Sequence, residues 1–234
     1  MLEETLKNGF AELGITPDGA ALPRYRTYYE RLTEMNQVMN LTAITGEDES
    51  ARLHFLDSAA ILTTADMRGA RVIDVGTGAG FPGLALKIAQ PDMALTLLDS
   101  LDKRVGFLRD VCERLGFDDV ECVHARAEDA ARGRRESYDF AVARAVARLE
   151  LLCELCLPFV RVGGKFIAMK GPDCADEVSG AARAVSVLGG RLAPLVSYTV
   201  PDTDAVRSLV IIEKLRPTPE KYPRRWAQIK KSPL

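Results

Sequence analysis

The sequence contains only two histidines, and its five cysteines include a single pair with C-x-x-C spacing, Cys153 and Cys156. A structural zinc site needs about four ligands, so no metal site is expected. The odd number of cysteines and the lack of a recognisable secretory leader indicate reduced thiols in a cytoplasmic protein, packed as small apolar side chains. No apolar run approaches the roughly 20 residues that span a bilayer, so no membrane association is expected.

A strong net charge is also missing. The formal net charge is −2, so the protein as a whole does not attract nucleic acid. The charges are unevenly distributed, since residues 1–65 hold five basic and ten acidic side chains, whereas residues 216–234 hold six basic and one acidic. Two interpretations of this last segment stay open: a solvated tail, or contact with an RNA backbone through Lys221, Arg224, Arg225, Lys230 and Lys231.

Three segments are predicted along the chain. Residues 1–65 form an N-terminal helical extension, in which apolar residues recur at helical spacing, and residues 66–215 form the main domain. Residues 216–234 form the basic tail, which is rich in proline and whose Tyr222 and Trp226 can pack on the core. Within the extension, Tyr25, Tyr28 and Tyr29 are expected to pack in the core rather than to stack on bases.

From Arg71 onward, short apolar strands alternate with helices. Strands are predicted at 71–75, 94–98, 120–123, 138–143 and 165–169, with helices at 84–90, 103–115 and 149–160. This alternation predicts an α/β fold, a doubly wound and mostly parallel sheet covered on both faces. Two further strand-like runs, 192–200 and 208–215, are joined too briefly for a crossover helix, so an antiparallel last strand is expected.

The strongest motif is a glycine-rich block between a strand and a helix, Val72-Ile-Asp-Val-Gly-Thr-Gly-Ala-Gly-Phe-Pro-Gly83. Gly76, Gly78 and Gly80 allow the backbone to turn sharply and to approach a ligand closely. Such a turn at the carboxyl end of a strand is typical of both NAD sites and S-adenosylmethionine sites.

Two acids lie close to this turn, and Asp74 is the one that distinguishes the two cofactors. Asp74 precedes the glycines, where its carboxylate is expected to repel a pyrophosphate and to attract the ammonium and sulfonium of S-adenosyl-L-methionine. Asp99 ends the next strand, where it can accept hydrogen bonds from the ribose hydroxyls of either cofactor. Because this pocket is built from the central sheet, loss of the tail from Lys221 onward is expected to leave cofactor affinity unchanged.

Other residues at the same edge of the sheet complete the candidate site. Ala127 and Glu128 follow the third strand, where an adenine can sit. Arg144 and Lys170 follow the next two strands and are the candidate catalytic residues, with Arg144 assigned to positioning rather than proton transfer.

These motifs resemble one family over nearly the whole chain, the bacterial 16S ribosomal RNA small-subunit methyltransferase G family, also called glucose-inhibited division protein B. The resemblance implies methyl transfer from S-adenosylmethionine to N7 of a guanine in the decoding-region loop of 16S rRNA, on free rRNA or on the small ribosomal subunit. By residue-by-residue carry-over, Gly76, Phe81, Ala127, Glu128 and Arg144 match the cofactor-binding positions of the family. Ala145-Val146 departs from it, because many relatives have Ala-Phe there. The matching segments are 40–44, 54–58, 74–83, 97–101, Lys103-Arg104 with Phe107-Leu108, 144–145, 169–171 and 221–224.

N7 of guanine carries a lone pair and no proton, so its methylation needs alignment and no general base. Because the sequence has only two histidines and no metal-ligand cluster, His54 is interpreted as a structural or interface residue, with proximity to the RNA as the alternative. Three other functions stay open: a non-catalytic RNA-binding or assembly factor with this fold, an NAD-dependent oxidoreductase, and a small-molecule methyltransferase.

Overall fold

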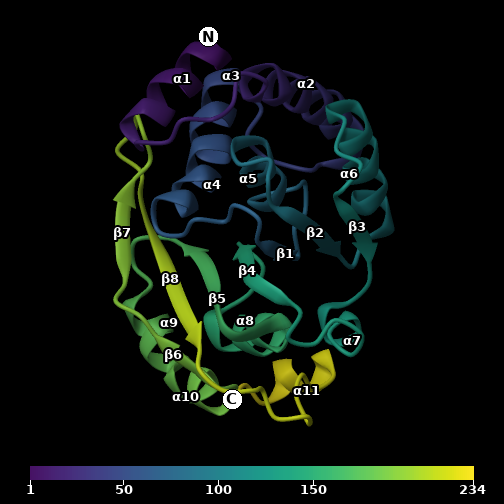
Figure 1. The fold of residues 1–234 in the computed structure, drawn as a ribbon, viewed down its shortest axis with the longest axis vertical. Coiled ribbons are helices and arrows are strands. Elements are labelled where there is room, and N and C mark those ends of the chain that lie inside the picture. The colour runs from purple at the N-terminus through teal and green to yellow at the C-terminus, as the bar shows by residue number, and fades with distance from the viewer.

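The computed structural model describes residues 1–234 and is built on one eight-stranded sheet (Figure 1). The strand order is β3-β2-β1-β4-β5-β8-β6, and β7 also pairs with β8. The first five strands are parallel, whereas β8 runs antiparallel to β5, β6 and β7. The strands are β1 Arg71–Val75, β2 Ala94–Asp99, β3 Glu121–His124, β4 Tyr138–Arg144, β5 Val160–Lys170, β6 Gly190–Leu192, β7 Val196–Thr199 and β8 Val206–Lys214. The predicted parallel sheet with an antiparallel last strand is thus confirmed.

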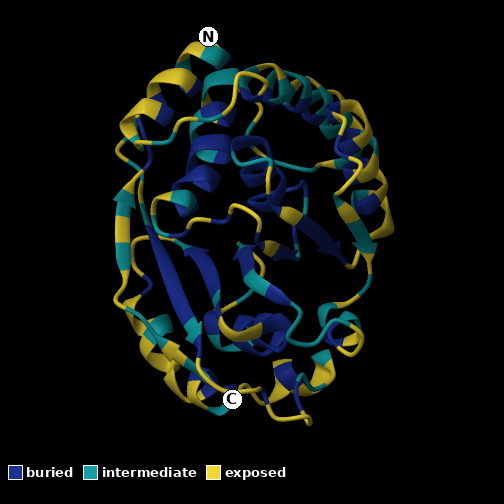
Figure 2. Ribbon diagram, in the orientation of Figure 1, coloured by how far each residue is buried: buried dark blue, intermediate teal, exposed yellow.

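Helices cover both faces of the sheet, because neighbouring strand residues point to opposite faces. Val72 belongs to one buried apolar cluster and Ile73 to the other. The first cluster lies under α5 (Gly83–Ala89) and α6 (Asp102–Leu115), and the second under α8 (Leu149–Cys156) and α10 (Ala182–Val187). Short helices α7 (Ala127–Ala130) and α9 (Ala175–Gly180) complete this part. Figure 2 shows the resulting pattern: the central strands are buried, the edge strands β3 and β7 are partly exposed, and α6 is exposed on its outer side, whereas every residue of α5 is buried.

The N-terminal helices belong to the first cluster. They are α1 (Leu2–Glu12), α2 (Ala21–Met39) and a continuous helical stretch made of α3 (Glu47–Ser50), a π-helical turn (Ala51–Leu56), α4 (Asp57–Ala59) and a 3₁₀ turn (Ala60–Thr63). Asn40 ends α2 in a left-handed conformation, φ 49°, which asparagine tolerates. Tyr25 and Tyr28 are fully buried, so their predicted core role is confirmed, whereas Tyr29 is only partly buried at the edge of the cluster. The extension therefore packs on the sheet through a shared core.

Two predicted elements are shortened or divided, and proline is the reason in both cases. The helix expected over 149–160 ends at Cys156, because Pro158 lies in a 3₁₀ turn, and β5 already begins at Val160. The strand expected over 192–200 is split into β6 and β7 around Pro194, which has no N–H for the ladder.

The C-terminal segment folds back on the domain and ends in α11 (Trp226–Lys231), which packs on α8 (Figure 1). Tyr222 and Ile229 are buried there. All five cysteines are free thiols and four of them are buried, as expected, with Cys122 partly exposed. None of the helices is both long and apolar enough to cross a membrane.

Candidate functional site

A pocket of about 310 Å³ lies at the carboxyl ends of β1, β2 and β3. Gly76 lines it after β1, Asp99 at the end of β2, and Ala127 and Glu128 after β3. Four of the predicted cofactor residues are therefore brought together. The loop after β4 closes one end of the pocket with Val146.

The glycine block forms the turn that the sequence predicts. Gly76, Gly78 and Gly80 have φ values of +73°, +61° and +104°, which side chains other than glycine adopt only with strain. A Cβ at Gly76 would lie 2.8 Å from the Val146 side chain, and one at Gly80 would meet the Tyr28 hydroxyl. Only Gly76 lines the pocket, so Gly78 and Gly80 shape the turn from behind.

Asp74 is placed differently from the prediction. Its side chain is fully buried and does not line the pocket, so a direct attraction to the cofactor's ammonium is not what the geometry provides. Oδ2 accepts hydrogen bonds from the Thr77 hydroxyl (2.6 Å) and from the Gly83 amide (2.7 Å), and burial raises the pKa of Asp74 to about 6. In a dinucleotide site, the first amide of this helix binds the pyrophosphate. Here that amide, from Gly83 at the start of α5, already donates to the Asp74 carboxylate.

Asp99 stands at the middle of the pocket. It is 4% exposed, and its two oxygens accept hydrogen bonds from the backbone amides of Gly78 and Leu101, each at 2.9 Å. Each carboxylate oxygen has a second lone pair, so ribose hydroxyls can still donate to it. The glycine turn and a fixed acceptor beside it fit S-adenosylmethionine.

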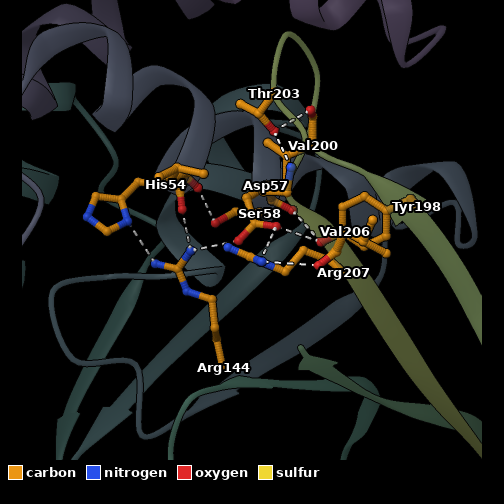
Figure 3. A network of polar contacts seen from close by, with 11 residues as sticks. His54, Asp57, Ser58, Arg144, Tyr198, Val200, Thr203, Val206 and Arg207 are labelled. Carbon is orange, nitrogen blue, oxygen red and sulfur yellow. Dashed lines mark hydrogen bonds and ion pairs between the residues drawn. The ribbon is translucent and has the colours of Figure 1, made fainter. Parts of the chain in front are cut away.

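Arg144 does not line this pocket and belongs instead to the polar network of Figure 3. Its guanidinium donates to the Leu53 carbonyl (3.1 Å), contacts Asp57 Oδ2 (3.3 Å) and lies 3.2 Å from His54 Nδ1. The same guanidinium lies 4.9 Å from the centre of the Phe81 ring. Arg144 therefore ties β4 to the π-helical turn of the extension.

His54 is held in the neutral form by these contacts. Because Arg144 donates to Nδ1, the proton of the ring belongs on Nε2, which lies 2.8 Å from the Thr42 hydroxyl. Burial, and then the charge of Arg144, lower the pKa of His54 to about 3. Its ring stacks on Phe81 at 4.4 Å, which removes Phe81 from the pocket wall as well.

Sequence reasoning missed the other members of this network. Asp57, 3% exposed, accepts a hydrogen bond of 2.7 Å from the Tyr198 hydroxyl of β7 and lies 3.9 Å from Arg207 of β8. Only the position of Asp57 within the His54–Ser58 motif pointed to it, because strands β7 and β8 lie far away in the sequence (Figure 3).

Lys170 also serves the structure of the loop after β4. Its Nζ donates to the Ala147 carbonyl (2.9 Å) and to Glu177 (2.6 Å). Glu177 in turn accepts the Leu149 amide. Lys170 therefore braces residues 147–149, next to the pocket wall at Val146, and its ammonium is engaged by these two partners.

The basic tail is only partly free. Lys221, Arg225, Lys230 and Lys231 are exposed, but Arg224 pairs with the fully buried Glu154 at 2.6 Å. The expectation that the tail stands apart from the pocket is wrong, because Trp226 is part of the pocket lining.

Comparison with known proteins agrees with this geometry. The family described as "rRNA small subunit methyltransferase G" matches residues 22–204. Two curated relatives carry the name "Ribosomal RNA small subunit methyltransferase G". The one from Alkaliphilus metalliredigens is 48% identical over 98% of this chain and 97% of its own length. The one from Pelotomaculum thermopropionicum is 46% identical over 100% of this chain and 99% of its own.

Solved structures show the same fold at low identity. TrmN from Thermus thermophilus superposes with a TM-score of 0.54 at 23% identity, over 68% of this chain and 48% of its own. A predicted O-methyltransferase from Agrobacterium tumefaciens gives 0.52 at 19% identity, over 77% and 95%. With the fold of a methyltransferase, a pocket that fits S-adenosylmethionine and relatives that match over their whole length, the chain belongs to the ribosomal RNA small subunit methyltransferase G family.

Proposed function

We propose that this protein transfers a methyl group from S-adenosylmethionine to N7 of a guanine in the decoding-region loop of 16S rRNA, within the cytoplasm. The observation that carries the proposal is the full-length similarity to the rRNA methyltransferases, combined with a pocket across the ends of β1, β2 and β3. Residues 1–65 act as a helical extension of the methyltransferase domain at 66–215, and residues 216–234 act as the basic tail.

In this proposal, residues at the ends of β1, β2 and β3 each contact a different part of the cofactor. The backbone at Gly76 approaches the methionine part, Asp99 accepts the ribose hydroxyls, and Ala127 with Glu128 borders the adenine. S-adenosylmethionine supplies a methyl group made electrophilic by the sulfonium. The loop after β4 places Val146 on the pocket wall, and we assign the approach of the guanine to this side.

The side chains around the site suit a reaction that removes no proton. His54 has both ring nitrogens engaged, and its lowered pKa keeps it neutral. The ammonium of Lys170 is occupied by Ala147 and Glu177. Arg144 and Lys170 are thus positioning residues, and the enzyme works by aligning N7, the methyl carbon and the sulfur.

RNA contact is assigned to the exposed cations of the tail, Lys221, Arg225, Lys230 and Lys231. Arg224 is left out of this set, because its guanidinium is committed to Glu154. Phosphate contacts of this kind position an RNA without reading its sequence.

Two other functions make different predictions. An NAD-dependent oxidoreductase needs the amide at the start of α5 for a pyrophosphate, and Asp74 already holds it. A non-catalytic assembly factor would bind RNA and cofactor without transferring a methyl group.

The test is to incubate the protein with S-adenosylmethionine carrying a labelled methyl group, and with either free 16S rRNA or small ribosomal subunits. Label is expected on one guanine, in a form that releases 7-methylguanine. A Gly76→Val variant, whose side chain collides with Val146, is the matched control and should transfer nothing. Cofactor binding without any labelled RNA would instead support the assembly factor.

A further inference from the structure

Trp226 is the one tryptophan of the chain, and it borders the cofactor pocket from the C-terminal tail. It opens α11, and its backbone amide donates to Glu128 Oε1 at 3.3 Å. It shares this end of the pocket with Ala127, Glu128 and Leu155. A residue from the last segment of the sequence thus meets residues that follow β3.

The tail around Trp226 is fixed on both sides. Before it, the Arg224 guanidinium binds the buried carboxylate of Glu154, and the Tyr222 ring is buried. After it, Ile229 is fully buried in the cluster beneath α8. The indole is therefore held at the pocket by anchors other than itself.

We propose that Trp226 forms the wall against which the purine of the cofactor packs. The sheet order β3-β2-β1 places the strand ends side by side, with Gly76 at one end of the pocket, Asp99 in the middle and Glu128 at the other. A ligand whose ribose binds Asp99 and whose methionine part lies toward Gly76 has its purine beside Glu128. The indole gives that purine a flat apolar surface. This inference rests on the proposed binding of S-adenosylmethionine.

An aromatic wall has a measurable effect on affinity. Stacking of a base on an aromatic side chain contributes enough that its loss weakens binding roughly 5- to 150-fold. Trp226→Leu keeps an apolar anchor for α11 but removes the aromatic surface, whereas Trp226→Phe keeps a smaller aromatic surface. A residue that only anchors the helix would tolerate both changes equally.

The experiment compares these two variants with the wild type and with Gln228→Ala, an exposed change on the same helix. Calorimetry with S-adenosylhomocysteine should give a Kd at least about 5-fold weaker for Trp226→Leu, and a Kd within about 3-fold of wild type for Trp226→Phe. Gln228→Ala should not change it. Melting temperatures measured without ligand check that α11 stays folded.

Fluorescence of the unmodified protein supplies a second measurement, because Trp226 is its only tryptophan. S-adenosylhomocysteine and adenosine should change the emission, whereas homocysteine alone should not. Binding detected by calorimetry with unchanged emission, or equal affinities for the leucine and phenylalanine variants, overturns the inference and leaves the proposed function standing. A wild-type protein that does not bind S-adenosylhomocysteine overturns both.

Discussion

The pair formed by Arg224 and Glu154 gives the sharpest prediction about the tail. Glu154 is fully buried on α8, while the Arg224 side chain is 23% exposed. Glu154 Oε1 accepts the Arg224 amide (2.8 Å) and Nε (2.9 Å), and Oε2 accepts Nη2 (2.6 Å). Replacing Arg224 with Met leaves a carboxylate buried beside an apolar side chain.

The expected loss follows from that burial. Removing one partner of a buried ion pair costs about 3–5 kcal/mol, and the partial exposure of Arg224 places this case near the lower end, at about 3 kcal/mol. For a domain of this size, that loss lowers the melting temperature by roughly 6–12 °C. The double variant Glu154→Met with Arg224→Met removes the stranded charge, so it should recover more than half of the lost free energy.

The assay is denaturant unfolding followed by far-UV circular dichroism, with the four proteins of the double-mutant cycle measured together. Arg225→Met is the matched control, because Arg225 is the neighbouring exposed arginine, and its change should stay within about 0.5 kcal/mol. If Arg224→Met is as stable as Arg225→Met, the ion pair with Glu154 does not hold the tail. Arg224 then becomes a candidate RNA contact again, like the exposed cations of the tail.

Three further outcomes are expected. His54→Gln should make the free energy of unfolding less sensitive to acid. The pKa of His54 is about 3 in the folded protein and 6.5 in the unfolded chain. The wild type therefore loses about 1.4 kcal/mol of unfolding free energy per pH unit as the pH falls from 6.5 toward 3. If the free energy of unfolding falls equally steeply with decreasing pH in both proteins across that range, this assignment is contradicted. Asp99→Ala should weaken S-adenosylhomocysteine binding roughly 10- to 150-fold, and unchanged affinity in calorimetry would remove Asp99 from the ribose site. Reversing Arg225, Lys230 and Lys231 to Glu should flatten the salt dependence of rRNA affinity by a slope of about 2, whereas an unchanged slope with a folded protein would exclude these residues as phosphate contacts.

The sheet and the glycine turn could be predicted from the sequence because they depend on local pattern. Apolar strands alternating with helices fix the parallel core, and glycines at 76, 78 and 80 fix the turn. Asp99 followed from the same logic, since it ends the strand next to the turn. These features need no knowledge of which distant segments meet.

The rest of the site depends on contacts between segments that are far apart in the chain. Asp74 lies beside the glycines, but whether its carboxylate faces the ligand or the Gly83 amide is decided by the pleat of β1 and the start of α5. Arg224 and Lys230 look alike as tail cations, and only the fold brings Glu154 to one of them. Trp226 reaches the pocket for the same reason.

The place of β8 in the sheet has a consequence for synthesis of the chain. β8 is synthesised after the other seven strands of the sheet, yet it pairs with β5 from Lys165 to Lys170. Until residues 208–213 have been made, the nascent protein presents the edge of β5, with buried residues such as Phe166 and Ile167, without its neighbour. An unpaired apolar edge is prone to associate with other chains, so messages truncated before β8 should yield aggregated protein that chaperones and proteases must clear.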